Sequence, residues 1–432
     1  MQLFETIRNA WKIADLRKKI LFTLFIIVIF RVGSFIPVPF INVEALQTGM
    51  ANATADANNL FSYLSILTGG ALEYGAIFAM SVTPYINASI IMQLLTVAIP
   101  PLERIAKDGE EGRKKIAKYT RYATVILGLL QGTAYYFYLR NMNYLTHKDG
   151  FPGVFAAVVI ILCFTAGSAI MMWLGEQIDN KGIGNGISIL LFAGIISRGP
   201  QAFAALWFYI TQGQYLLVAG IVIAFLAVIA FIVFMTGAER RIPVQYAKKV
   251  VGRKMYGGQA SHLPIQVNMS GVLPIIFASS ILSIPSTIIA FMGNNNTGRL
   301  YRFLSLFSFE SSFYMILYLA FIIFFAYFYV TIQYNPVEMA NNLRKNSGVI
   351  PGIRPGKPTS DFIGKIISRI TLIGALFLGV IAILPLAVGK FGNVSGISLG
   401  GTSILILVGV ALDTMKAVES QMLMRYYKGF LD

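Results

Sequence analysis

Few residues in this chain have the types and spacing that catalysis or metal binding needs. Its two histidines, His147 and His262, are too few for a histidine-based metal cluster. Its one cysteine, Cys163, lies in an apolar run, which favours a small buried side chain over a reactive thiol. The sequence contains no G-x-x-x-x-G-K-[ST] loop, no H-E-x-x-H and no G-x-S-x-G. We therefore expect a non-catalytic protein without a cofactor, which draws its energy from partners or from the membrane potential.

One glycine-rich run, GIGNG at residues 182–186, superficially resembles a dinucleotide-binding fingerprint. Its spacing differs from that fingerprint, and the sequence before it has the pattern of a helix rather than the strand that a nucleotide site requires. We interpret the run as a flexible helix start at the cytoplasmic face of a membrane.

The composition indicates a chain whose solvent is mostly lipid. Of its 432 residues, 56% are hydrophobic and 12% are charged, whereas soluble domains carry about 25% charged residues. These values exclude a disordered protein, a soluble enzyme and a basic nucleic-acid-binding tail. The sequence predicts an all-α polytopic membrane protein with ten transmembrane helices, each near the ~20 apolar residues that a bilayer requires. The spans are 20–36, 74–95, 122–139, 154–174, 184–196, 216–236, 271–292, 314–332, 366–386 and 402–418.

The distribution of basic residues predicts the orientation. The chain has 35 Lys and Arg against 19 Asp and Glu. If the N-terminus is inside, 28 of the basic residues fall inside, six fall outside and Arg31 falls in the first span. Cytoplasmic loops of membrane proteins carry such an excess of Lys and Arg. We therefore expect a multi-pass protein of the cytoplasmic membrane with both termini in the cytoplasm.

Three cytoplasmic segments are basic enough to suggest binding. Residues 1–19 are typical of an amphipathic helix on anionic phospholipids, although a solvated basic tail is the alternative. Residues 237–270 alternate like a two-stranded projection broken at 257–258, and residues 335–365 place Arg354 at the tip of a stiff Pro- and Gly-rich turn. Both loops could dock an acidic protein surface or ribosomal RNA, or could simply be the topology signal.

Two irregular features suggest a pathway through the membrane. An apolar run begins at Leu60 and stops at Gly69-Gly70, too short to span, so it is either re-entrant or an external amphipathic helix. Prolines interrupt the second and seventh spans, at Pro84 and at Pro274 and Pro285, which suggests two repeats of five helices. Tight packing through small residues is the alternative interpretation.

The spans carry no ionisable residue at the midplane, although proton and ion carriers normally need one. A pathway lined by Val, Ile and Leu would not select an ion, but it could seal by dewetting. The main rival function, a secondary transporter of a small solute, therefore lacks its coupling residue. An intramembrane enzyme lacks a nucleophile–base pair and metal ligands.

Six long motifs stand out along the chain: SVTPYINASIIMQLLT from Ser81, GIGNGISI from Gly182, AERRIPVQYA from Ala238, NMSGVLPIIFASSI from Asn268, GIRPGKPT from Gly352 and GGTSILI from Gly400. With these motifs the chain resembles the SecY family, the channel subunits of the bacterial Sec translocase, in a Gram-positive, Bacillus-like form. The resemblance covers all ten spans in order.

This resemblance implies an hourglass pore between two pseudo-symmetric five-helix halves, residues 20–200 and 201–432. Unfolded secretory polypeptides would cross through the pore, and transmembrane segments would leave sideways between the second and seventh spans. The ring at the waist would be Val82, Ile86, Ile187, Leu191, Ile276 and Ile406. Isoleucine is the commoner residue in the family at positions 82 and 191, but Val and Leu keep the ring apolar.

The resemblance also assigns a plug, a lateral gate and docking residues. The plug, residues 60–72, would include Leu60, Phe61, Tyr63, Leu64, Ile66, Leu67, Gly69 and Gly70. The polar gate would be Asn87, Gln131 and Ser280, and the docking residues Arg240, Arg241 and Arg354. The implied partners are SecE, SecG, the SecA motor ATPase, the ribosome, signal sequences and nascent chains, anionic phospholipids and a second copy of the chain.

Overall fold

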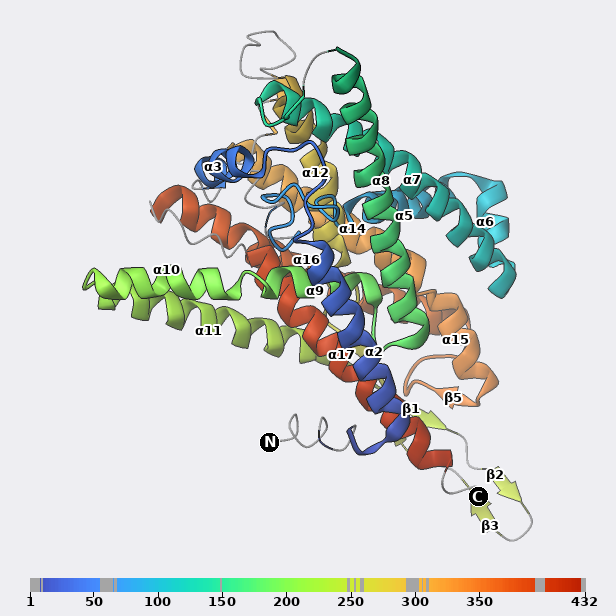
Figure 1. Ribbon diagram of the computed structural model, residues 1–432. Helices are drawn as coiled ribbons and strands as arrows, with labels where there is room; N and C mark the ends of the chain where they lie inside the picture. The colour runs from blue at the N-terminus through green and yellow to red at the C-terminus, as the bar shows by residue number, and fades with distance from the viewer. Residues whose placement is uncertain are drawn as a thin grey trace.

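The computed structural model describes residues 8, 11–54, 65, 68–147, 150–246, 249–251, 254–256, 260–292, 303–304, 306–307, 311–392 and 401–428. Helices dominate these residues (Figure 1). Ten helices lie over the ten predicted spans: α2 (Ala14–Gly33), α5 (Thr83–Ala98), α7 (Gly109–Asn141), α8 (Gly150–Lys181), α9 (Gly186–Ile196), α11 (Tyr215–Gly237), α12 (Leu273–Met292), α14 (Ser312–Gln333), α16 (Lys357–Gly392) and α17 (Gly401–Lys428).

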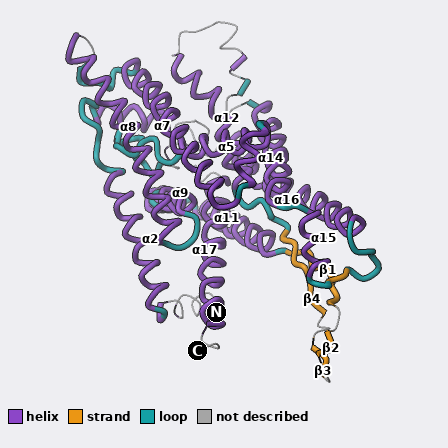
Figure 2. The backbone as a smooth tube through the Cα atoms, turned by 90° about the vertical axis from the view of Figure 1, so that its right-hand side faces the viewer, coloured by secondary structure: helices purple, strands orange, loops and turns teal. Residues whose placement is uncertain are grey.

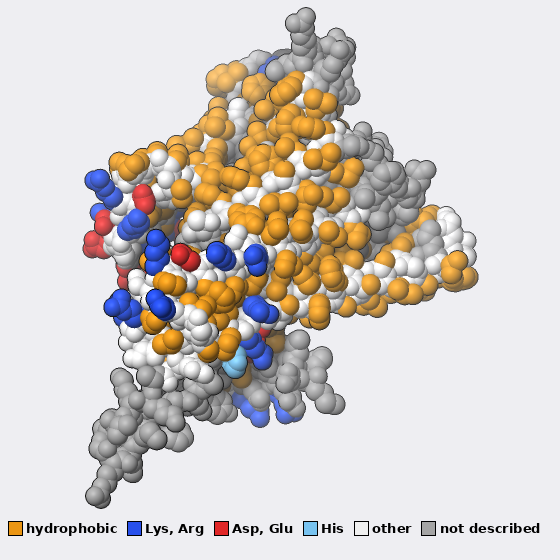
Figure 3. Space-filling model, turned by 180° about the vertical axis from the view of Figure 1, so that it is seen from behind, with side chains coloured by type: hydrophobic (Ala, Val, Ile, Leu, Met, Phe, Trp, Pro, Cys, Tyr) orange, Lys and Arg blue, Asp and Glu red, His pale blue; other side chains and the backbone are white. Residues whose placement is uncertain are grey.

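Five helical segments of the described chain are long and apolar enough to cross a membrane by length and composition alone. A sixth appears if α5 and α6 (Pro100–Lys107), which meet at a bend of 102°, are taken as one broken span. Hydrophobic side chains cover much of the surface in Figure 3, and Lys and Arg gather on the side that carries α6 and α15 (Pro336–Lys345). The predicted all-α polytopic membrane fold is confirmed.

The predicted boundary between the N-terminal surface helix and the first span, at residue 19, does not coincide with a helix boundary in the structure. Helix α2 begins at Ala14, so residues 14–19 continue into the first span. Leu16 is buried against Ile183 and Val418, and Lys19 Nζ donates to Gln421 Oε1 at 3.2 Å. This part of the predicted surface helix therefore packs on protein, because two neighbouring segments offer it an apolar and a polar partner.

The second span also begins later than predicted. Helix α5 starts at Thr83 rather than at residue 74, and Pro84 lies in its first turn, where the missing N–H of proline has no cost. Pro84 is therefore not a helix interruption. The same holds for Pro274 at the start of α12, whereas Pro285 lies inside that helix as expected.

Residues 68–82 form a chain of turns that is largely buried. Gly167 of α8 lets this segment approach closely, because a Cβ atom on Gly167 would lie 2.0 Å from the carbonyl oxygen of Ile77. We expect Gly167→Ala to lower the free energy of unfolding by about 1–3 kcal/mol through overpacking. Thermal unfolding in detergent measures the effect. Gly220→Ala in α11, where nothing lies within 4 Å, is the matched control; equal melting temperatures for both variants would contradict the prediction.

A small sheet unites the two long basic loops, residues 237–270 and 335–365. Strands β4 (Ala260–Gln266), β1 (Glu239–Tyr246) and β5 (Gly348–Val349) pair in that order, antiparallel throughout. One apolar cluster under this sheet joins Ile242 and Ile265 of the first loop to Ile350 and Ile363 of the second. Figure 2 shows the sheet at one end of the molecule, outside the helices.

The two paired strands predicted for the first loop are present as β1 and β4, but they do not form a separate projection, because β5 of the second loop pairs with β1. The first loop contributes two strands to the three-stranded sheet, and a separate hairpin of β2 (Lys249–Val251) and β3 (Lys254–Tyr256) extends from it. The predicted break at 257–258 lies outside the described residues. Helix α10 (Gly199–Thr211), which runs beside α11 in Figure 1, was also not expected.

Candidate pore and gate

The six predicted ring residues meet in one apolar cluster. Five of them are buried members, and Ile187 is half-buried against the same cluster. They come from four helices of both predicted halves: Val82 and Ile86 from the start of α5, Ile187 and Leu191 from α9, Ile276 from α12, and Ile406 from α17. The arrangement brings branched aliphatic side chains from both halves together in the interior. Their role as a seal stays a prediction.

Local sequence explains why α9 presents its two ring residues inward. Asn185 caps the helix, its side chain accepting a hydrogen bond from the Ser188 N–H at 3.0 Å. The carboxylate of Asp179, on α8, accepts from the Gly186 N–H at 2.7 Å. The GIGNG run is therefore a capped helix start, which confirms the helix-start interpretation. Ile187 and Leu191 are four residues apart and so lie on one face of α9.

The helices of the predicted lateral gate also meet. Helix α5 contacts both α7 and α12, and α7 contacts α12. Asn87 and Gln131 are half-buried and Ser280 is buried. The carbonyl oxygen of Ser280 accepts a hydrogen bond from Ser283 Oγ at 2.7 Å. The three helices could separate along this contact, while the specific role of the three side chains stays a prediction.

Only the end of the predicted plug is described. Leu60, Phe61, Tyr63, Leu64, Ile66 and Leu67 lie outside the described residues. Gly69 and Gly70 are buried and adopt positive φ angles of 63° and 89°, a conformation that glycine takes without strain. Because residues 68–72 are buried in protein, the structure favours a re-entrant segment over an external surface helix at this end.

Sequence reasoning missed a polar network beside these glycines. The Arg198 guanidinium contacts both Glu73 Oε1 and Ser65 Oγ. Arg31 Nη1 donates to the carbonyl oxygen of Gly69 at 2.8 Å. The signal was present, because a charge in so apolar a chain needs a partner. The pairing could not be predicted, since 125 positions separate Arg198 from Glu73.

The three predicted docking residues lie on the sheet unit, which consists of β4, β1 and β5 with the turn between β5 and α16. Arg240 and Arg241 are exposed on β1, and Arg241 Nε lies 2.6 Å from Glu239 Oε1. Arg354 is exposed in the turn between β5 and α16, and its carbonyl oxygen accepts from Thr359 Oγ1 at 2.9 Å. Because β1 pairs with both β4 and β5, the two basic loops present one combined surface.

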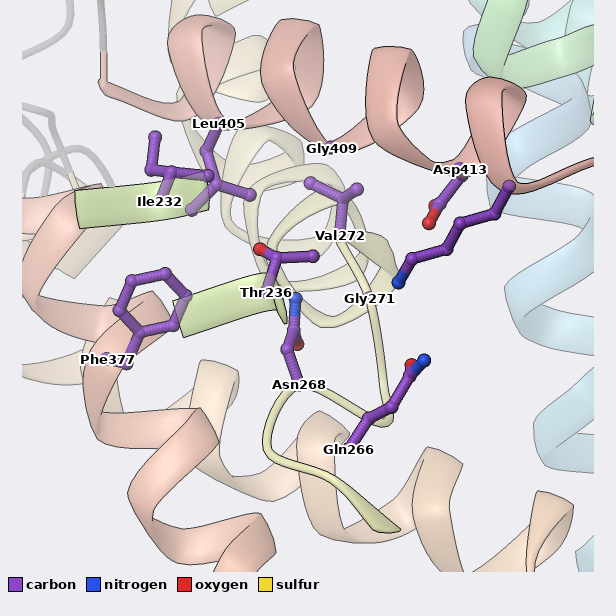
Figure 4. A pocket seen from close by; sticks show the side chains of 11 residues that line it. Ile232, Thr236, Gln266, Asn268, Gly271, Val272, Phe377, Leu405, Gly409 and Asp413 are labelled. Carbon is purple, nitrogen blue, oxygen red and sulfur yellow. The ribbon is translucent and has the colours of Figure 1, made fainter. Parts of the chain in front are cut away.

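A pocket lies next to the apolar cluster, where α11, α16 and α17 approach residues 266–272, the segment that leads into α12 (Figure 4). Its polar lining includes Thr236, Asn268 and Asp413, and Asn268 Oδ1 is buried without a hydrogen-bond partner within the described structure. Buried water typically satisfies such an atom. Across the described ranges, no group of three or more His, Cys, Asp or Glu side chains could hold a metal ion.

The relatives of the chain are translocase subunits. The chain is 44% identical to the protein translocase subunit SecY of Streptomyces galbus, over 98% of both chains. It is also 44% identical to that of Bacillus subtilis, over 99% of this chain and all of the relative. The expected Bacillus-like resemblance is confirmed, and the Streptomyces protein matches equally well.

Solved structures share the fold at lower identity. A SecY structure whose plug domain is described as stabilising the closed translocation channel has a TM-score of 0.67 at 18% identity, covering 96% of this chain and 97% of that chain. Sec61 in a canine ribosome–channel complex has a TM-score of 0.62 at 17% identity, covering 94% and 92%. A profile of the SecY family matches residues 76–415. The chain therefore belongs to the SecY family.

Proposed function

We propose that this protein is the channel through which unfolded secretory polypeptides cross the cytoplasmic membrane. The observation that carries the proposal is that the six predicted ring residues, from four helices of both halves, all lie in or against the main apolar core of the protein. The family relationship supports the same function, since the relatives are protein translocase subunits.

The chemistry of the ring suits a substrate of any sequence. Branched aliphatic side chains exclude water when the waist is empty, and they can close around an extended chain because apolar contacts are non-directional. A signal sequence or nascent transmembrane helix gains roughly 0.3–0.6 kcal/mol for each centred Leu, Ile, Phe or Val that moves into lipid. A sideways opening between α5 and α12, which contact each other in this structure, would allow that transfer.

The channel performs no catalysis in this proposal and depends on partners for energy. Both termini lie in the cytoplasm, and the exposed arginines of the sheet unit dock the SecA motor or the ribosome. A Sec61 relative in a ribosome–channel complex supports ribosome docking. SecE and SecG complete the translocase, anionic phospholipids contact the basic surface, and a second copy of the chain is a further partner. The two halves, residues 20–200 and 201–432, move apart when the channel opens.

A stalled secretory chain should cross-link to the ring. In a Cys163→Ala background, single cysteines at Ile86 or Ile276 should form disulfides with a cysteine placed in the translocating segment, because the proposal places both side chains beside the path. Gel electrophoresis of the cross-linked product measures the yield. Ile223→Cys, on a 67% exposed position of α11, is the control that should give no product. Equal yields at all three positions, or saturable uptake of one metabolite by the purified protein, would contradict the channel.

A further inference from the structure

Two arginines hold residues at the end of the predicted plug and directly after it. The plug-base network consists of Arg31, Ser65, Gly69, Glu73 and Arg198. Arg198 Nη2 contacts Glu73 Oε1 and Ser65 Oγ, and Ser65 Oγ donates to Glu73 Oε1 at 2.6 Å. Arg31 Nη1 donates to the Gly69 carbonyl oxygen at 2.8 Å. The contacts of Arg198 and Arg31 tie Ser65, Gly69 and Glu73 to other parts of the chain, whereas the bond from Ser65 to Glu73 joins two of these residues to each other.

The network is shielded from solvent. The side chains of Arg198 and Glu73 are 18% and 21% exposed, and Ser65 is buried. An ion pair in such surroundings is screened far less than a surface pair, and removing one partner leaves a charge without compensation. The guanidinium of Arg31 also stacks on the Phe35 ring at 4.5 Å, which fixes its direction. The pairing is therefore strong enough to hold one position of the segment.

The anchor of the network lies at the junction of the two predicted halves. Ser197 and Arg198 stand between α9 and α10, in the stretch of chain that leads from one half to the other. Ser197 packs so closely that a Cβ atom on Gly69 would lie 2.7 Å from Ser197 Oγ. Helix α9 carries the ring residues Ile187 and Leu191. A movement of α9 that widens the ring would therefore pull Arg198 away from Glu73.

We propose that Arg198, which follows α9, and Arg31, on α2, are positioning residues that together form a latch on Glu73 and Gly69, and that widening of the ring breaks the Arg198–Glu73 pair. The inference rests on the proposed channel function. It assigns to the Glu73 carboxylate the role of keeping the resting channel closed. It also couples the junction between the two halves to the apolar ring that seals the pore.

Two measurements test the latch: the resting conductance of single variants, and the return of that conductance towards the parent value when the two charges are exchanged. The full chain with its translocase partners is reconstituted in planar bilayers, and the potassium current is recorded without a secretory substrate. Glu73→Gln, which keeps the size of the side chain, and Arg198→Gln should each raise the resting current about tenfold, because the closed state loses the ion pair. The reversed pair, Glu73→Arg with Arg198→Glu, should return the current towards that of the parent.

A second readout separates a latch from a structural role. Both single variants should export a preprotein with a weakened signal sequence faster than the parent, whereas a damaged fold would export it more slowly. Glu103→Gln, which breaks the exposed 2.6 Å pair with Lys107, is the control and should change neither value. An unchanged current in Glu73→Gln, or no rescue by the reversed pair, overturns the latch while leaving the channel function intact. A parent protein that moves no polypeptide overturns both.

Discussion

Replacing Ile86 or Ile276 with serine should make the closed channel leak ions. Both residues belong to the main apolar core, to which residues of α5, α9, α12 and α17 contribute together with those of other helices, and each is 9% exposed. Burying such a side chain is worth about 1.5–3 kcal/mol relative to exposing it. A hydroxyl in the same place binds water and stabilises a hydrated waist. We expect an increase of about tenfold or more in resting potassium current, with glycine at either position acting in the same direction.

Planar-bilayer recordings of the reconstituted translocase measure this current in the absence of a substrate. Ile223→Ser is the matched control, because it makes the same chemical change on the outer face of α11, where the side chain is 67% exposed. The control should leave the current unchanged. If Ile86→Ser and Ile276→Ser also leave it unchanged, these residues are not the seal, and the apolar cluster is ordinary helix packing.

The sequence predicted the features that depend on local composition. Ten apolar runs became ten helices, and the start of α9 was placed at the GIGNG run because glycine and asparagine are helix-start residues. The ring residues followed from the family resemblance, and the structure brings them together in one cluster. The apolar pattern alone could not have selected them, since buried and lipid-facing positions carry the same residue types in a membrane protein.

Features that depend on distant contacts were missed or wrong. Leu16 looked like a membrane-surface residue, but Ile183 and Val418 bury it. Pro84 looked like a helix interruption, but it lies in the first turn of α5. The segment before it is not helical and packs closely against Gly167 of α8. The pairing of β1 with β5 joins loops about a hundred positions apart. Such contacts are set by tertiary packing, which no local sequence pattern records.

Reversing one charge at Arg354 should cripple motor-driven secretion. The residue is exposed in the turn of the sheet unit, close in the chain to β5, which pairs with the β1 strand that carries Arg240 and Arg241. The turn is held by contacts that do not use the Arg354 side chain. One of them is the hydrogen bond from Thr359 Oγ1 to the Arg354 carbonyl oxygen at 2.9 Å. Arg354→Glu should therefore leave the turn in place while changing the charge that it presents.

An acidic docking surface on the motor is attracted by the Arg354 guanidinium and would be repelled by a glutamate carboxylate in its place. Like charges across an interface cost several kcal/mol. We expect at least about a tenfold loss in the rate of SecA-driven preprotein translocation at normal expression, with an unchanged resting current. Arg113→Glu on α7 is the control, since it makes the same charge change at an exposed basic residue away from the sheet unit. Full activity of Arg354→Glu with intact motor binding would remove Arg354 from the docking surface. A loss in both variants would instead mean that net basic charge, rather than this particular turn, recruits the motor.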